Sequence, residues 1–507
     1  MWRWDEFAVS GSRGCAVARW VVVRKLSIRE RATEHFETAQ PRDRETPHTG
    51  NLIMRTEPDS FAILDAALDA ARAAGAAEAD AVFHSTDQNI SRFANSNLHQ
   101  NMSEVSAELT LRVIAGEATG VASTTVFDAD EIARTAALAR EAARHADPLQ
   151  NFSGLYRHNE PLPAVRTFDD ATAAIAPADK ARALREMFDR GREFEVQFAG
   201  VYGTRASSIA AGNTHGIRRY CTLTSSDATV IAIGANGSGY ATSVDRRNLD
   251  VVALGEEATS KATLCANVLE DIEPGAYDVI LEPPAIAEVL DWMNLITLSG
   301  SAYDDGSSFF VNNIGKQVLG TNFTLADDAL DPAFLPFPFD LEGLPKRRVA
   351  LIENGVVRTP AVDKAYADRL GFAPTASCWN IGGTEHGSAF HLSIDGGHAT
   401  RDELIRSTKH GIWVTRFNYV NGLLEPKTAL MTGTTRDGTF LIRDGEVVAR
   451  LPNLRWTQSI VEAFSRIEGL SRERCRVGTW YNHFGGTIAP VMKIAGWNVT
   501  GKQSALG

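Results

Sequence analysis

The sequence predicts an α+β protein, with helices packed on an antiparallel sheet in its N-terminal domain and a β-rich, barrel-like C-terminal domain. Two observations support this prediction. Between residues 60 and 268 the order helix, strands, helix occurs twice, with apolar residues first at helical spacing and then in alternation. After Pro274-Gly275, short strand-like runs are separated by Gly, Asn and Pro, as is typical of a sandwich or barrel.

Length and composition indicate a globular protein with two domains. The chain has 507 residues, 44% of them hydrophobic and 22% charged, and we expect an N-terminal domain over 54–273 and a C-terminal domain over 274–507. The net charge of −12 disfavours binding to nucleic-acid phosphates, which requires a basic patch. The five cysteines are scattered and include no Cys-x-x-Cys pair, which favours a reducing cytoplasm over a disulfide framework.

The first 53 residues differ from the rest of the chain. Their basic residues alternate with acidic ones, and their longest apolar run, Cys15 to Val23, is interrupted by Arg19. Such a run is too short to span a bilayer, and no cleavage site of a signal peptide follows it. We expect residues 1–53 to be a disordered extension or to precede the true start at Met54.

The N-terminal domain has clear periodic signals. Apolar spacing predicts a helix from about Ser60 to a stop at Gly75, and residues 105–113 alternate as a half-buried strand. Asp128 and Glu131 predict the cap of a helix that reaches His145. Further elements are expected as strands over 81–85, 89–93, 118–125, 196–211, 217–224 and 229–235, and as helices from Pro177 and over 251–268.

The C-terminal domain is marked by turn and cap signals. Asn354-Gly355 is a strong two-residue hairpin signal, because both residues must adopt positive φ. Thr400 and Glu403 predict a capping box at the start of a helix, which Gly411 is expected to end. Further elements are expected as strands over 277–282 and 412–416, helices over 285–298 and 456–467, and a hairpin over 440–448.

Four motifs of this domain follow one another in a specific order and spacing. They are Asp340-Leu-Glu342-Gly343-Leu-Pro345, Glu353-Asn354-Gly355-Val356, Ser407–Thr415 and Phe440–Val448. Each motif is weak alone, but together they resemble the TldD/PmbA family, the two-subunit metallopeptidases of bacteria and archaea. The likeness extends over roughly Phe61 to Gly501. It implies an α+β N-terminal domain and a barrel-like C-terminal domain.

The resemblance also shows what this chain lacks. In the family's active subunit, the helix that opens the second domain carries His-Glu-x-x-x-His, with two zinc ligands and a general base. The corresponding segment here, Leu281–Leu290, contains no histidine, and the pair His-Glu occurs nowhere in the chain. Cys475 lies at a distance from Pro490 similar to that of the family's ligand cysteine, but one thiolate does not hold a metal. The chain is therefore similar to the PmbA (TldE) subunit. We expect it to have neither a catalytic residue nor a metal or cofactor site, with zinc in an active partner.

Other candidate residues have a plainer interpretation. Glu385, His386, His391 and His398 could form a replacement metal site, but on a strand His386 and His391 would point to opposite faces, so loop or surface positions are favoured. Asp340 and Glu342 could be a carboxylate pair, but their motif lies between prolines, which favours a role in a turn. The residues that remain as candidates for a peptide channel or for turns are Asp340, Glu342, Gly343, Asn380, Gly383 and His386.

The resemblance implies a non-catalytic subunit of a two-component zinc metallopeptidase that processes or degrades unfolded peptides. Its partner would be a TldD-like catalytic subunit, or a second copy in a homodimer, and a peptide between subunits would be held mainly by backbone hydrogen bonds to a sheet edge. Two alternatives remain: a self-sufficient peptidase with an unrecognised site, and a regulatory or binding protein, as in the family's older description as modulators of DNA gyrase. We expect neither nucleic acid nor a membrane as a partner.

Overall fold

The computed structural model describes residues 55–331, 335–382, 387–478 and 485–502. All of them belong to the unit Leu52–Gly507. The expected extension over 1–53 and the start at Met54 lie outside the described residues. Within the described ranges, no helix is long and apolar enough to pass through a membrane.

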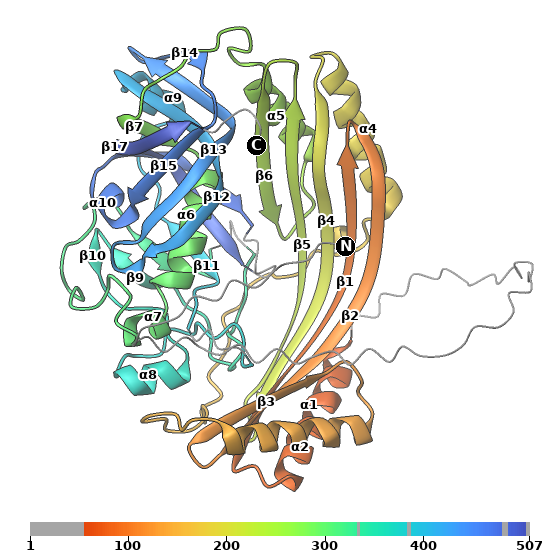
Figure 1. The fold of residues 1–507 in the computed structure, drawn as a ribbon. Helices are drawn as coiled ribbons and strands as arrows, with labels where there is room; N and C mark the ends of the chain where they lie inside the picture. Colours follow the sequence, from red (N-terminus) through yellow and green to blue (C-terminus); the bar gives the residue numbers. More distant parts are fainter. Residues whose placement is uncertain (1–54, 332–334, 383–386, 479–484, 503–507) are drawn as a thin grey trace, which may run out of the picture. The chain divides into compact units, whose positions relative to one another are not determined.

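The first sheet consists, within these ranges, of six antiparallel strands in the order β3-β2-β1-β4-β5-β6 (Figure 1). Their bounds are Glu78–Ala94 (β1), Asn97–Ala115 (β2), Ala118–Thr124 (β3), Gln197–Asn213 (β4), Arg218–Ile233 (β5) and Ser238–Asp245 (β6). The prediction of separate strands over 81–85 and 89–93 was wrong, as was that over 217–224 and 229–235. The polar residues between them stay in the ladder, since Thr86 pairs with Ser207 and Ser225 with Arg205.

Each half of this sheet has the predicted order helix, strands, helix, and each contains three strands. The helices are α1 (Glu57–Ala73) and α2 (Ala129–His145) on β1 to β3, and α4 (Pro177–Arg192) and α5 (Val251–Thr263) on β4 to β6, with the short α3 (Asp170–Ala173) before α4. The two halves have separate cores, around Phe83 and Leu109 in the first and around Phe188 and Phe198 in the second. The half-buried strand predicted over 105–113 enters the core only from Leu109, because Val105 is 53% exposed.

The second sheet is mixed and closes on itself. Its strands are β7 (Gly275–Leu281), β8 (Leu325–Asp327), β9 (Val349–Glu353), β10 (Val356–Val357), β11 (His391–Ile394), β12 (His410–Glu425), β13 (Leu430–Arg443), β14 (Glu446–Arg450), β15 (Leu454–Ser459), β16 (Ile467–Val477) and β17 (Gly486–Lys502). β7 pairs with β12 on one side and with β17 on the other, which closes a ring through β13 and β15. The predicted fold class is thus confirmed.

Helices and turns complete the second domain. They are α6 (Pro283–Ile296), α7 (Gly300–Asp304), α8 (Lys364–Leu370), α9 (Arg401–Arg406), the 3₁₀ turn η1 (Pro426–Thr428) and α10 (Ile460–Ser465). The Asn354-Gly355 hairpin is confirmed, with φ of 50° and 76°, as is the capping box of Thr400 and Glu403. The hairpin over 440–448 is confirmed as well, with its turn between β13 and β14.

Two predictions of this domain were wrong. Residues 456–467 are not one helix: they contain the end of β15 and then α10. Trp456 lies in the domain core against Phe417 and Trp497, and its backbone pairs with that of Gly433, so packing overrides the helical pattern. Gly411 does not end α9 either, because the helix stops before Ser407 and Gly411 already pairs within β12.

Candidate functional site

Two cavities lined by described residues lie between the first sheet and the second domain. The larger has a volume of about 480 Å³ and the smaller of about 270 Å³. Arg205 of β4 and Ser225 of β5 line both of them, so the cavities adjoin along these two strands. Together they form the candidate site.

The larger cavity has one polar and one aromatic wall. The polar wall is the inner face of the first sheet, where every second residue of β1 and β4 points the same way. It includes Thr86, whose Oγ1 lies 2.8 Å from Ser207 Oγ and 2.5 Å from His84 Nε2. The opposite wall comes from the second domain and contains Leu335, Phe337, Leu341, Trp379, Asn380 and Phe390. Such a space suits an extended chain with a polar backbone and apolar side chains.

The smaller cavity lies where α6 faces β4, β5 and β6. Pro284, Ala287, Glu288 and Asp291 of α6 line it, because residues three, four and seven apart share one face of a helix. The start of α6 is fixed by Glu282, which accepts hydrogen bonds from Lys261 Nζ at 2.7 Å and from Trp413 Nε1 at 3.2 Å. α6 is therefore held firmly while it exposes these side chains.

Several charged side chains line the smaller cavity. Arg205 forms an ion pair with Asp227, and Arg416 Nε donates to Asp437 Oδ2 at 2.9 Å. Burial raises the pKa of Glu288, an effect that the neighbouring Arg416 only partly opposes. The cavity thus contains a carboxylate that has lost part of its hydration.

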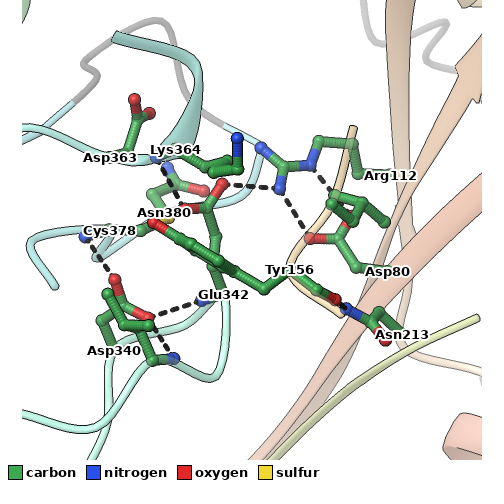
Figure 2. Close-up of polar contacts among 12 residues, drawn as sticks. Asp80, Arg112, Tyr156, Asn213, Asp340, Glu342, Asp363, Lys364, Cys378 and Asn380 are labelled. Atoms are coloured by element: carbon green, nitrogen blue, oxygen red, sulfur yellow. Dashed lines mark hydrogen bonds and ion pairs between the residues drawn. The ribbon is translucent and has the colours of Figure 1, made fainter. Parts of the chain in front are cut away.

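The turn that carries the predicted residues Asp340, Glu342 and Gly343 contacts the first sheet, and its Leu341 lines the larger cavity. Figure 2 shows Glu342 next to Arg112 and Asp80. Arg112 of β2 donates to both oxygens of Asp80 in β1, at 2.9 and 2.6 Å, and to Glu342 Oε1 at 2.8 Å. The second oxygen of Glu342 accepts from the backbone N–H of Lys364 at 2.9 Å. All three charged side chains are at most 5% exposed. We call Asp80, Arg112 and Glu342 the carboxylate junction.

The electrostatics of the junction follow from its charge count. One buried arginine faces two carboxylates, so ionisation of both leaves an excess negative charge in a dry environment. Burial accordingly raises the pKa of Glu342 to about 8, although the charge of Arg112 opposes the shift. Burial also raises the pKa of Asp340, against the hydrogen bonds that this carboxylate accepts from backbone N–H groups.

Asp340 and Gly343 shape the turn that presents Glu342. Asp340 Oδ1 accepts from the backbone N–H groups of Glu342 at 3.1 Å and of Leu344 at 2.9 Å, as aspartate commonly does in turns. Gly343 has a φ of 86°, and a Cβ there would lie 2.5 Å from Ile217 Cγ2. Its carbonyl oxygen accepts from Arg219 Nε at 2.8 Å. The turn therefore fits closely onto the first sheet.

The remaining predicted residues are dispersed. Asn380 lines the larger cavity, and its Oδ1 accepts from the backbone N–H of Gly382 at 2.8 Å. Gly383 and His386 lie outside the described residues, as does Glu385. His391 is fully buried in β11, with Nε2 2.8 Å from Leu335 O, so the favoured loop or surface position was wrong for this residue. It is buried because β11 lies between β8 and β17.

Sequence reasoning did not find the charged residues of the smaller cavity. Arg205 lies within the strand predicted over 196–211 but was not recognised as a site residue, and Asp227 lies in the interruption predicted between 217–224 and 229–235. Both residues belong to continuous strands that pair with each other. Glu288 was part of the segment compared with the zinc motif, but only the absence of histidine was considered there. The signal that could have revealed the charged residues on β4 and β5 is the recurrence of polar residues at every second position of a long strand.

Comparison with known proteins agrees with this architecture. Residues 274–501 match the family model of the PmbA/TldA metallopeptidase C-terminal domain, and residues 79–143 match that of the PmbA/TldA metallopeptidase domain 1. The chain belongs to the PmbA/TldD family. Among solved structures, TldE from Thermococcus kodakarensis superposes on this PmbA/TldD protein with a TM-score of 0.78 and 19% identity, over 86% of this chain and 99% of that one. A protein of Thermotoga maritima described as a candidate modulator of DNA gyrase superposes with a TM-score of 0.75 and 17% identity, over 86% of this chain and 99% of that one.

Curated relatives match over shorter stretches. A metalloprotease of Methanothermobacter thermautotrophicus is 20% identical over 245 residues, which are 48% of this chain and 52% of the relative. A metalloprotease TldD homolog of Buchnera aphidicola is 27% identical over 178 residues, or 34% and 35% of the two chains. The chain thus spans about half or less of the length of these relatives.

The residues at α6 do not fit the zinc ion of the family's active subunit. Zinc prefers three or four histidine, cysteine or carboxylate ligands in tetrahedral geometry. The face of α6 that lines the cavity offers only Glu288 and Asp291, close to the positive charges of Arg205 and Arg416. Among the described residues, no three His, Cys, Asp or Glu side chains are grouped so as to hold a metal ion.

Proposed function

We propose that this protein is a PmbA/TldE-like subunit of a two-component metallopeptidase that acts on unfolded peptides, and that its partner supplies the zinc and the general base. One observation carries this proposal: the helix that opens the second domain begins with Pro283-Pro284 and has Glu288 in place of His-Glu-x-x-x-His. The two adjoining cavities support a role in holding an extended peptide rather than in cleaving it.

The partner is a TldD-like subunit with the zinc motif, and a homodimer forms where that subunit is missing, because two subunits of one fold can replace each other in a contact. We expect an interface well above the roughly 1,600 Å² of a standard complex. The described cysteines, Cys221, Cys265, Cys378 and Cys475, are free, which supports the proposed cytoplasmic location.

The test is cleavage of an unstructured peptide by this chain, by a subunit carrying His-Glu-x-x-x-His, and by their mixture. We expect this chain alone to be inactive and to hold well under one zinc per chain after dialysis. The mixture should be active and should lose activity on addition of a zinc chelator. Cys475→Ser should behave like wild type in the mixture, since Cys475 lies on β16 and is not part of a group of metal ligands among the described residues. Chelator-sensitive cleavage by this chain alone would refute the proposal.

A further inference from the structure

Glu288 is a carboxylate of the smaller cavity whose charge is offset only in part, by the neighbouring Arg416. Arg205 and Arg416 are each engaged by an aspartate, Asp227 and Asp437 respectively. Within the part of the chain that the structure describes, Glu288 makes neither a hydrogen bond nor an ion pair. A partly buried carboxylate without a partner is costly, because the protein has not replaced the water that it lost.

The described residues that line the cavity carry a net negative charge. The charged side chains among these described lining residues are two positive ones, Arg205 and Arg416, and three negative ones, Asp227, Glu288 and Asp291, which leaves a net charge of −1. Asp437, which holds Arg416, adds a further negative charge behind the wall. A concave surface with a net charge, placed between protein walls, attracts ligands of the opposite sign. The cavity is thus suited to a cation and repels a carboxylate.

The volume of the cavity and its other lining groups limit the class of ligand further. A volume of about 270 Å³ is smaller than the usual pocket for a whole ligand and fits one side chain or one chain end. Ser225, Thr229, Thr242 and Ser243 line the same space, and their hydroxyl groups are able to accept hydrogen bonds. An ammonium or guanidinium group has several N–H donors to satisfy, and this wall offers several acceptors.

We propose that the smaller cavity binds a positively charged group of a peptide, an ammonium or a guanidinium, with Glu288 as its counter-ion. The inference rests on the proposed function, because it takes the ligand to be a peptide. The larger cavity adjoins at Arg205 and Ser225 and would receive the neighbouring, more apolar part of the same chain. The protein would then prefer basic segments or free N-termini among unfolded peptides.

The test measures binding of four unstructured peptides of equal length, labelled at the C-terminus, by fluorescence anisotropy with the full chain. Each peptide has either a free or an acetylated N-terminus, and either a lysine or the uncharged norleucine at one position. The set therefore distinguishes binding of the N-terminal ammonium from binding of the lysine ammonium. We expect at least one charged form to bind about tenfold or more tightly than the acetylated norleucine peptide, as for a hydrogen bond to a charged group. Glu288→Gln should reduce this preference to within about twofold.

Glu446→Gln is the matched control, because Glu446 is an exposed glutamate of β14 that does not line the smaller cavity. This variant should keep the full preference for charged peptides. The melting temperature of Glu288→Gln should be no lower than that of wild type, since the substitution removes a charge that is only partly offset. An unchanged melting temperature also shows that the variant is folded. Equal binding of all four peptides, a preference that survives in Glu288→Gln, or no binding of any peptide would overturn the inference. Partner-dependent cleavage without charge preference would refute this subsite and leave the proposed function standing.

Discussion

Arg112 and Arg450 both connect the first sheet with the second domain, but their partners differ in kind. Arg112 binds the carboxylates of Asp80 and Glu342. Arg450, in β14, donates to backbone carbonyl oxygens of β6 and α5, and its guanidinium lies 5.2 Å over the ring of Phe440. Its acceptors are Ser238 O at 3.0 Å, Lys261 O at 3.0 Å and Ala262 O at 3.2 Å. We call this second contact the carbonyl junction.

The comparison separates two ways to bury an arginine. The carboxylate junction gains strong attraction but depends on the protonation of Glu342, whose pKa is raised. The carbonyl junction is weaker per contact, but its acceptors do not titrate. One end of the interface between the sheets is therefore sensitive to pH, and the other is not. Four experiments test this difference, in order of decreasing effect.

Arg112→Ala should be the most destabilising change. It leaves the buried Asp80 and Glu342 without a counter-ion, which costs about 3–5 kcal/mol. Denaturant unfolding at pH 8 measures the loss. The triple variant Arg112→Met, Asp80→Asn, Glu342→Gln should recover most of it, because no buried charge remains. A loss below about 1 kcal/mol for Arg112→Ala would show that water reaches the junction.

Glu342 should make the protein more stable as the pH falls. Its folded pKa of about 8 lies above the model value of 4.5, so between these pH values the folded chain binds a proton that the unfolded chain lacks. Stability therefore falls as pH rises through this window, by about 1–3 kcal/mol between pH 6 and 9. Asp340, whose pKa is raised from 3.8 to about 6, acts in the same direction but mainly below pH 6.

The measurement is a series of denaturant melts from pH 6 to 9 on wild type, Glu342→Gln and Arg450→Met. Glutamine resembles the protonated carboxyl group, so Glu342→Gln should lose much of the pH dependence. Arg450→Met should keep it, because the carbonyl junction has no titrating acceptor. If wild type and Glu342→Gln respond equally to pH, the raised pKa is not a property of this junction.

Arg450→Met should destabilise the protein less than Arg112→Ala, by about 1–3 kcal/mol, because it leaves three backbone carbonyl oxygens with fewer donors but no unpaired charge. Arg443→Met is the matched control. Arg443 lies on the adjacent β13 and pairs with Glu270 at the surface, so its loss should leave the denaturation midpoint close to that of wild type. Equal midpoints for both variants would contradict a structural role for Arg450.

Gly343→Ala should give the smallest loss of stability. Gly116→Ala is the control that separates the contact with Ile217 from the backbone penalty. Both glycines have positive φ, 86° and 67°, but a Cβ at Gly116 meets nothing within 4 Å. Both variants therefore carry the backbone penalty of about 1 kcal/mol, and only Gly343→Ala also pushes against Ile217, for about 1 kcal/mol more. Thermal melting of the pair measures the difference. Identical melting temperatures would mean that the turn moves away from the first sheet at no cost.

Local patterns predicted the parts of the fold that depend on local interactions. The caps at Asp128 and Thr400 and the turn at Asn354-Gly355 were predicted correctly, since each is satisfied within a few residues. The region from Trp456 was predicted wrongly, because a ring of strands buries that side chain, and the ring is formed by segments far apart in the sequence.

The candidate site was harder to predict for the same reason. Arg112 alternates with apolar residues in the half-buried strand predicted over 105–113, a pattern that is typical of a position facing solvent. It is buried because Glu342, 230 positions away, supplies a charge that the sequence pattern does not reveal. The Asp340–Pro345 motif was recognised by its turn residues, but its contact with Arg112 and Arg219 depends on tertiary structure.

The closure of the second sheet has a consequence for biosynthesis. Leu281 of β7 pairs with Met492 of β17, so the ring cannot close until the ribosome has made nearly the whole chain. At about 5–20 residues per second, this delay is on the order of 10–40 s after β7 has been made. The first sheet is complete at Asp245, and its neighbouring strands are mostly consecutive, so it can fold during that time. The nascent second domain would then assemble against a surface that already exists, with Arg112 and Asp80 in place before Glu342 arrives.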